Sequence, residues 1–349
     1  MRRVTTLVAV MATAALALTA CGGGGSGASA SSSASGAGAK SSLKVGLAYD
    51  VGGRGDQSFN DSAAKGLDKA KTEFGVQVKE LEAANGETDA QKEERLRLLA
   101  GDGYNPIIGV GFSYATALKK VAAEFPEVKF AIVDDSSITA ANVTNLVFAE
   151  NQGSFLVGTI AAQASKSGNI GYIGGVNTPL LQKFQAGFAA GAKAVNPGIK
   201  VQVKYLTEPP DFSGFGDPAK GKTVAQGMLD GGADVIYAAA GGSGAGAFEA
   251  VAAAKKLAIG VDSDQYLTAA AAVKPVIVTS MLKRVDVAVY NEIKSVVDGS
   301  ALTGTQVFDL KVDGIGYSAS NEAVKPFTAK ADEFKAKIIS GAVTVPEKP

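Results

Sequence analysis

The chain has 349 residues, of which 46% are hydrophobic and 19% are charged, with 34 basic and 34 acidic residues. This length suits two domains of ordinary size, and the hydrophobic share is enough for substantial cores. The balanced charge argues against a nucleic-acid partner, which usually requires a basic face. Histidine is absent and Cys21 is the single cysteine. His-based triads, an intramolecular disulfide and the usual zinc ligands are therefore excluded.

Residues 1–20 have the pattern of an export signal, and the composition of residues 21–42 indicates a flexible tether. Two arginines precede an apolar run from Val4 to Leu18, which is shorter than the roughly 20 residues that span a bilayer. The LTAC sequence that ends at Cys21 resembles the bacterial lipobox, in which this cysteine is lipidated and becomes the mature N-terminus. The alternative is an ordinary secretory signal with a chance cysteine. The tether is almost entirely Gly, Ser and Ala, a composition that forms no core.

From residue 43 onward, short β-rich runs alternate with helical patterns. We expect strands over residues 43–49, 76–81, 106–111, 129–135, 143–150, 169–175, 199–206, 233–240, 258–262, 273–280 and 306–312. We expect helices over residues 58–74, 88–100, 114–124, 154–164, 179–195, 218–229, 245–257, 285–297 and 322–339. Such alternation predicts an α/β fold with parallel sheets and helices on both faces.

No Pro- or Ser-rich linker divides this body, so we place the domain boundaries in tight crossovers near Glu150, Asp262 and Gly304. The first predicted lobe comprises residues 43–150 and 263–304, and the second comprises residues 151–262 and 305–349. Two lobes joined by such crossovers would form a hinge, with a cleft between the ends of the two sheets.

The strand-to-helix loop YDVGGRGDQSFN, residues 49–60, is predicted to be the first wall of this cleft. Asp50 stands directly after an apolar strand, as Asp134 does later in the chain, and a carboxylate there rarely benefits packing. Asp56 has two interpretations, a ligand contact or a cap of the following helix. Phe59 likewise either stacks on a ligand or is the first member of the apolar stripe of its helix.

A second glycine-rich turn lies in AAAGGSGAGAF, residues 238–248. Its Gly242-x-Gly244-x-x-Ala247 spacing fits a relaxed dinucleotide fingerprint, and Asp262 ends the next strand 20 residues after Gly242. The motif lies late in the chain and no lysine follows the glycines, so we interpret Gly242 as part of a ligand-facing turn without phosphate. Asp262 remains a candidate for binding a ribose under either interpretation.

Three other side chains are candidates for the cleft. Phe212 and Phe215 lie in a loop that is too polar for a normal core segment, which favours a binding role. Lys283 follows an apolar strand, although it or Arg284 could simply pair with Asp286. The sequence around Asp262 lacks the remaining ligands of a calcium loop, so we expect no metal site.

Seven motifs occur in the order found in one known family: GDQSFN near the start, FAENQGSFLVG (148–158), IGYIGG, DPAKGK (217–222), DVIYAAAGGSGAG, IGVDSDQ and TSMLKRVD. Together they resemble the basic membrane protein family of bacterial lipoproteins, which includes the purine nucleoside receptors of ABC importers. The resemblance covers residues 43 to about 339. It implies a type I periplasmic-binding-protein fold, with two Rossmann-like lobes, three hinge crossovers and one nucleoside in the cleft.

The resemblance also implies roles for individual residues. It places the residues on the base side of the ligand at Asp50, Asp56, Phe59, Asn60 and Asp134. It associates Asp262 and Lys283 with the ribose, and it leaves the second stacking aromatic open between Phe212 and Phe215.

We therefore expect a monomeric solute-binding lipoprotein that is anchored through Cys21 at the extracytoplasmic face of the cell membrane. It would bind a nucleoside, which the resemblance implies is a purine nucleoside, and present it to an ABC permease without any cofactor. One alternative is a sensor of the same fold that signals to a membrane partner. The other is an enzyme acting on a ribose-containing substrate, which the missing catalytic residue types disfavour.

Overall fold

The computed structural model of the protein describes residues 42–349. The predicted signal, Cys21 and the tether up to residue 41 lie outside the described residues. Within the described part of the chain, no helix combines the length and the apolar character needed to cross a membrane.

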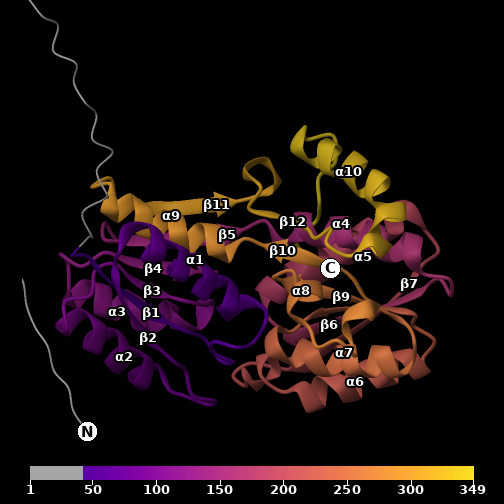
Figure 1. Cartoon of the computed structure of the whole chain (residues 1–349), viewed down its shortest axis with the longest axis horizontal. Coiled ribbons are helices and arrows are strands. Elements are labelled where there is room, and N and C mark those ends of the chain that lie inside the picture. Colours follow the sequence, from indigo (N-terminus) through magenta and orange to yellow (C-terminus); the bar gives the residue numbers. More distant parts are fainter. Residues whose placement is uncertain (1–41) are drawn as a thin grey trace, which may run out of the picture. The chain divides into compact units, whose positions relative to one another are not determined.

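The first lobe contains a six-stranded parallel sheet. Its strands, in spatial order, are β11 (Gly304–Phe308), β5 (Val143–Phe148), β4 (Phe130–Val133), β3 (Ile107–Gly109), β1 (Lys44–Ala48) and β2 (Gln77–Leu81). Helices α1 (Phe59–Phe74) and α9 (Val285–Val297) pack together on one face, and α2 (Asp89–Gly101) and α3 (Ala115–Glu124) on the other. Figure 1 shows α9, late in the chain, beside α1.

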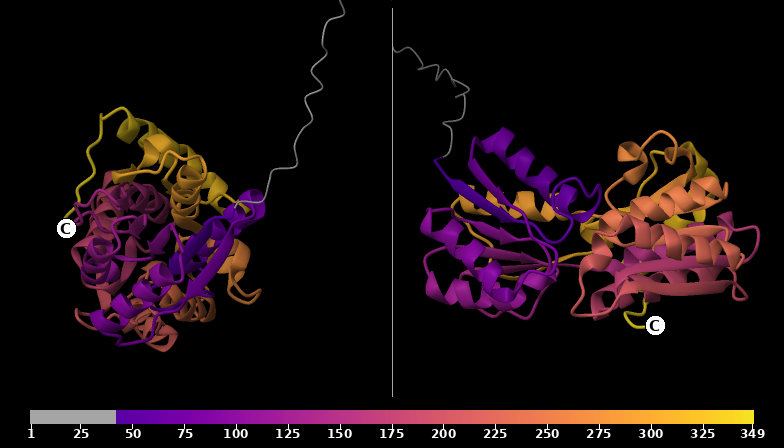
Figure 2. Two further views of the ribbon diagram at one scale, coloured as in Figure 1. Left: turned by 90° about the vertical axis from the view of Figure 1, so that its left-hand side faces the viewer. Right: turned by 90° about the horizontal axis from the view of Figure 1, so that it is seen from below.

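The second lobe repeats this arrangement. Its strands, in spatial order, are β12 (Ile315–Tyr317), β10 (Ile277–Lys283), β9 (Leu257–Asp262), β8 (Val235–Ala239), β6 (Asn169–Val176) and β7 (Lys200–Thr207), of which β12 alone is antiparallel. Helices α4 (Glu150–Ala164), α5 (Pro179–Val195) and α10 (Lys325–Ile339) cover one face. Helices α6 (Pro218–Asp230) and α7 (Gly244–Ala253) cover the other, and the short α8 (Gln265–Thr268) follows β9. Figure 2 shows these layers from two further directions.

Side-chain alternation along the strands explains the layers. In β1, Val45 and Leu47 enter the core under α1 and α9, whereas Ala48 enters the core under α2 and α3. A strand whose two faces are both buried reads as a nearly continuous apolar run, as LKVGLAY does. The prediction of an α/β fold with parallel sheets and helices on both faces is confirmed.

Two of the three predicted lobe boundaries, those near Asp262 and Gly304, differ from the crossovers between the sheets. Residues 263–304 are predicted to lie in the first lobe, but β10 belongs to the second sheet. Residues 305–349 are predicted to lie in the second lobe, but β11 belongs to the first sheet, where it pairs with β5. The chain therefore passes between the sheets after β5, after β10 and after β11. An apolar strand such as IVTSMLK shows that it is buried on both faces, but not which of two similar sheets buries it.

The strand order places a ligand site. In both sheets the order 2-1-3-4-5 holds, counted from β1 and from β6, so the chain direction across the sheet switches beside the first strand. Ligands of such open α/β sheets bind outside the carboxyl ends of the strands at this switch point. The loops after β1, β3 and β4, and those after β6, β8 and β9, are therefore the expected walls.

Candidate functional site

A pocket lies between the carboxyl ends of the two sheets, with walls from both lobes. About 540 Å³ of it is not filled by protein atoms, part of which is open to solvent. Eight of the predicted ligand-binding residues line it: Asp50, Asp56, Phe59, Asn60, Asp134, Phe215, Asp262 and Lys283.

Asp56 caps helix α1 from the loop before it. Its Oδ1 accepts the backbone N–H groups of Ser58 (2.8 Å) and Asp61 (3.1 Å), and its Oδ2 accepts the backbone N–H and the side-chain amide of Asn60 (2.9 and 3.1 Å). A carboxylate has about four acceptor positions, so these contacts occupy it fully. The structure therefore supports the capping interpretation of Asp56, although this side chain also lines the pocket.

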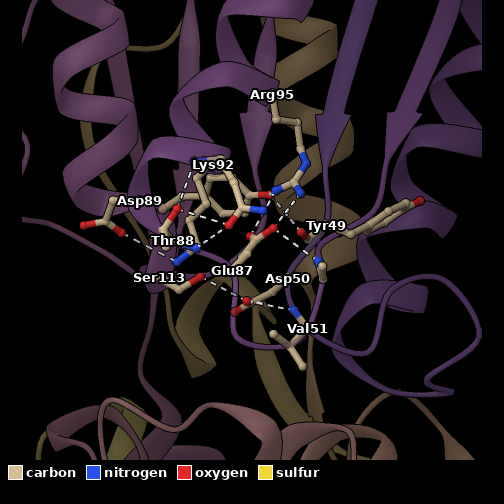
Figure 3. Close-up of polar contacts among 12 residues, drawn as sticks. Tyr49, Asp50, Val51, Glu87, Thr88, Asp89, Lys92, Arg95 and Ser113 are labelled. Atoms are coloured by element: carbon tan, nitrogen blue, oxygen red, sulfur yellow. Dashed lines mark hydrogen bonds and ion pairs between the residues drawn. The ribbon is translucent and has the colours of Figure 1, made fainter.

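Asp50 lies directly after β1 and is held in a polar cluster (Figure 3). Its Oδ1 accepts the Val51 N–H at 2.8 Å and the Ser113 hydroxyl at 3.0 Å. The backbone N–H of Asp50 donates to Asn60 Oδ1 at 3.1 Å, so Asn60 joins the two ends of the loop. Burial raises the pKa of Asp50 to about 6, although the Val51 N–H and the Ser113 hydroxyl lower it.

The support behind Asp50 is a partly buried ion pair between Arg95 and Glu87. The two terminal guanidinium nitrogens of Arg95 donate to Glu87, Nη1 at 3.0 Å and Nη2 at 2.6 Å, and Nη1 also donates to the Tyr114 hydroxyl at 2.7 Å. That hydroxyl donates to the carbonyl of Tyr49 at 2.9 Å. A bidentate pair of this kind constrains geometry as well as adding energy, and it places the backbone next to Asp50.

Lys283 is the centre of a buried ion cluster on the cleft floor. It is 1% exposed, and its Nζ lies 2.6 Å from Asp134 Oδ2 and 3.3 Å from Glu150 Oε1. The rings of Phe59, Phe148 and Phe184 surround the ammonium, with centroids 5.1, 5.0 and 5.5 Å away. The predicted alternative, an ion pair with Asp286, is made by Arg284 instead.

Two acceptor atoms of this cluster have no partner. Asp134 Oδ1 and Glu150 Oε2 are buried without a hydrogen bond. Burial raises the pKa of both carboxyl groups and Lys283 opposes the rise. Burial alone would lower the pKa of Lys283, but the surrounding carboxylates raise it above its ordinary value, so Lys283 stays a cation. Unpaired buried acceptors are rare, and Asp134 is one of the residues that line the pocket.

Asp262 ends β9 as Asp134 follows β4, and both residues have left-handed backbone conformations, with φ of 63° and 71°. Aspartate is one of the few non-glycine residues that adopts this region readily. Asp262 Oδ2 accepts the Ser58 hydroxyl at 2.6 Å. Burial raises the pKa of Asp262 to about 7, although Lys283 and the Ser58 hydroxyl both lower it.

Aromatic rings from both lobes line the pocket. Phe59 packs against the core and also lines the pocket, so both of its predicted roles have a structural basis. Phe215 lines the pocket from the second lobe, with its ring against Gly175. Phe212 does not line this pocket and instead meets Phe112 edge to face, with centroids 5.8 Å apart.

Sequence reasoning missed several walls of the pocket. Gly241, not Gly242, is the lining glycine of the second turn; its φ is +54° and it lies beside the Phe215 carbonyl. Phe184 reads as an ordinary apolar position of α5, and nothing in the sequence marks it as facing a cleft. Gly111 carried a usable signal, because it follows a strand; a Cβ there would lie 2.3 Å from Asp50 Oδ2.

No group of three or more acidic or cysteine side chains within residues 42–349 is arranged to hold a metal ion. The site thus consists of carboxylates, one lysine and aromatic rings. These groups bind donors and flat apolar surfaces.

Comparison with known proteins gives the family. Residues 43–349 match the Bmp family model, described as ABC transporter substrate-binding protein PnrA-like. The chain is 34% identical over 332 residues to the ABC transporter nucleoside-binding protein BmpA of Lactococcus lactis, covering 88% of this chain and 90% of that protein. It is 37% identical over 307 residues to an uncharacterised lipoprotein of Pyrococcus horikoshii, covering 84% and 72%.

A solved structure agrees. The crystal structure of an ABC transporter solute-binding protein from Aeropyrum pernix K1 matches with a TM-score of 0.75 and 32% identity, covering 87% of this chain and 94% of that one. The two lobes have the type I fold of periplasmic binding proteins. The chain belongs to the Bmp family of PnrA-like ABC transporter substrate-binding proteins.

Proposed function

We propose that this protein captures a purine nucleoside in the interlobe pocket and delivers it to an ABC importer. The observation that carries the proposal is the combination, in one pocket, of aromatic rings from both lobes with a buried carboxylate, Asp134, that has a free acceptor atom. A flat base needs apolar faces, and the amino and hydroxyl groups of a nucleoside need acceptors.

Aromatic rings favour a planar ligand. Phe59 enters the pocket from the first lobe, and Phe184 and Phe215 enter from the second. A planar heterocycle between such rings gains dispersion and apolar burial on both of its faces. In this proposal Phe59 and Phe215 contact the base, and Phe212 does not.

The charge of the pocket favours a neutral ligand. Among the residues that line it, Asp50, Asp56, Asp134 and Asp262 are acidic, and Lys283 is the one base. Lys283 is already paired with two carboxylates. A phosphate would find no unpaired cation in these walls and would be repelled by the carboxylates. The pocket therefore suits a nucleoside better than a nucleotide.

The surroundings of the pocket carboxylates suggest how the nucleoside is oriented. Asp262 and Lys283 influence each other electrostatically, whereas Asp50 is held in the first lobe by the Val51 N–H and the Ser113 hydroxyl. We assign the ribose hydroxyls to Asp262 and Lys283 and the donors of the base to Asp50 and Asp134. Asp56 and Asn60 then act by holding the loop in shape.

Delivery to a permease follows from the family, whose members bind substrates for ABC transporters. A relative carries the name lipoprotein, which supports our proposal that Cys21 is the lipid-bearing residue and that the protein is held at the extracytoplasmic membrane face. Incorporation of labelled fatty acid into the expressed protein, and its loss in Cys21→Ala, would test the anchor.

Calorimetry with matched ligands tests the binding proposal. We expect adenosine, guanosine or inosine to bind, and the corresponding 5′-monophosphate, free base and ribose to bind at least about 100-fold more weakly, because each loses one group of contacts or adds a repelled charge. Chromatography after long incubation should return the nucleoside unchanged. Failure of every nucleoside to bind would refute the substrate assignment.

A further inference from the structure

Ser58 makes a contact that the roles discussed so far do not use. It precedes α1, is 0% exposed, and its hydroxyl donates to Asp262 Oδ2 at 2.6 Å. The same hydroxyl oxygen lies 3.4 Å from the carbonyl oxygen of Val261, the residue before. A hydroxyl-to-carboxylate distance of this size is that of a charge-assisted hydrogen bond.

This hydrogen bond joins the two lobes. Ser58 belongs to the loop that follows β1 in the first sheet, and Asp262 ends β9 in the second. One further hydrogen bond runs beside it, from the Ser263 hydroxyl to the Ser58 carbonyl at 2.9 Å. Of these two hydrogen bonds between the lobes, the one from the Ser58 hydroxyl involves the Asp262 carboxylate and the one from the Ser263 hydroxyl does not.

Within residues 42–349, the Ser58 hydroxyl is the neutral group that donates a hydrogen bond to the Asp262 carboxylate. Lys283, the nearby cation, has its short contact with Asp134, and the hydrogen bonds of the described residues engage Oδ2 of Asp262 but not Oδ1. A hydrogen bond to one oxygen of an aspartate carboxylate restricts the rotation of the group about the Cβ–Cγ bond. Its other oxygen is then available at a defined angle on the pocket wall.

We propose that Ser58 is a positioning residue of the ligand site: its hydroxyl orients the Asp262 carboxylate across the lobe interface to accept the vicinal hydroxyl pair of the ligand. This inference rests on the proposed function for the identity of the ligand. Because donor and acceptor belong to different lobes, the acceptor is correctly oriented only when the lobes are together. Recognition of the hydroxyl pair and closure of the cleft are thereby one event.

Ser58→Ala tests the proposal by ligand discrimination. We expect affinity for a ribonucleoside to fall about 10- to 100-fold, the scale of a hydrogen bond to a charged group. Affinity for the 2′,3′-dideoxynucleoside of the same base should change less than about threefold, because that ligand does not use Asp262. Ser263→Ala, which removes only the neighbouring contact, should not discriminate between the two ligands. Equal losses for both ligands in Ser58→Ala, or the same discrimination in Ser263→Ala, would overturn the proposal.

A double mutant separates action through Asp262 from a separate effect. If Ser58 acts through Asp262, Ser58→Ala combined with Asp262→Asn should bind the ribonucleoside no more weakly than Asp262→Asn alone. Additive losses would contradict the proposal. Should Ser58→Ala fail to fold, Ser58→Cys keeps the shape but provides a weaker donor, and a smaller loss with the same ligand preference is expected.

Titration of the carboxyl group supplies a readout that needs no ligand. The Ser58 hydroxyl stabilises the ionised form of Asp262, so its removal should raise the midpoint of the Asp262 carboxyl signal followed by carbon-13 NMR against pH. An unchanged midpoint would overturn the proposal. If the wild-type protein binds no nucleoside, the proposed function fails, but this titration still decides whether Ser58 controls Asp262.

Discussion

Replacement of Lys283 by methionine should be strongly destabilising. The Lys283 ammonium is buried, with Asp134 Oδ2 2.6 Å away and Glu150 Oε1 3.3 Å away, and the side chains of these two carboxylates are 5% and 1% exposed. Methionine has a similar length, so it leaves little empty space. It does remove the cation that forms ion pairs with two buried carboxylates, each of which already has one unpartnered oxygen.

The size of the effect follows from removing one partner of a buried ion pair, which costs about 3–5 kcal/mol. It should depend on pH. Burial already raises the pKa of Asp134 and Glu150 in the folded protein, and losing Lys283 removes the group that lowers it most. The folded variant then takes up protons that the unfolded chain has lost, so each such group costs about 1.4 kcal/mol more per pH unit until it ionises. The loss should therefore be larger at pH 8 than at pH 5.

Urea unfolding without ligand, at pH 5 and at pH 8, measures both effects. Lys92→Met is a matched control: Lys92 is 6% exposed, but its nearest carboxylate, Asp89, is 3.7 Å away and half exposed. We expect the control to lose less than about 1 kcal/mol, as is usual for such pairs. The reasoning is refuted if Lys283→Met loses no more than Lys92→Met at pH 8, or loses the same amount at both pH values.

Three further predictions concern single residues. Phe215→Ala should weaken purine nucleoside binding by about 1–3 kcal/mol, the range for a lost stacking ring, whereas Phe212→Ala should change calorimetric affinity little; the reverse order would show that Phe212 contacts the base. Because burial raises the pKa of Asp262 to about 7 and a hydroxyl pair binds its ionised form, ribonucleoside affinity should rise between about pH 5.5 and about pH 8. Asp262→Asn should bind weakly at every pH, and a pH dependence that survives in it would assign the effect to another group. Asp56→Ala should lower the free energy of unfolding by about 1–2 kcal/mol through loss of the α1 cap, and a variant with unchanged unfolding but lost binding would show that Asp56 is a ligand contact instead.

The elements of the fold were predictable because their signals are local. The apolar stripe of α1 and the apolar run of β1 show directly which residues enter a core. Asp134 was singled out for the same reason, since a carboxylate just after a buried strand stands out in the sequence alone, and Asp262 was singled out by its spacing from the second glycine-rich turn. Both occupy left-handed positions at the carboxyl ends of equivalent strands.

Other parts of the site depend on contacts between distant segments. Glu150 reads as an ordinary acid in the first turn of a helix, and only the fold brings it to Lys283. Ser58 reads as a routine residue before a helix, yet its partner lies 204 positions away. The two lobe boundaries near Asp262 and Gly304 failed similarly, because the pairing of β10 with β9 and of β11 with β5 is a choice between two sheets of the same pattern.

The two halves of the molecule use equivalent positions for complementary purposes. Asp134 follows the fourth strand of its sheet and pairs with Lys283 from the second lobe, while Asp262 ends the fourth strand of the other sheet and accepts from Ser58 in the first. Each carboxylate thus has its protein partner across the cleft and not within its own lobe.

Bringing the lobes together removes both carboxylates from water, which is costly unless every acceptor atom is paired. Asp134 Oδ1 remains unpaired within the protein, so a ligand that donates hydrogen bonds to it lowers the energy of the closed arrangement specifically. A ligand with that differential effect shifts the population towards closure, and the binding of donors and the closing of the lobes are then linked by the same two carboxylates.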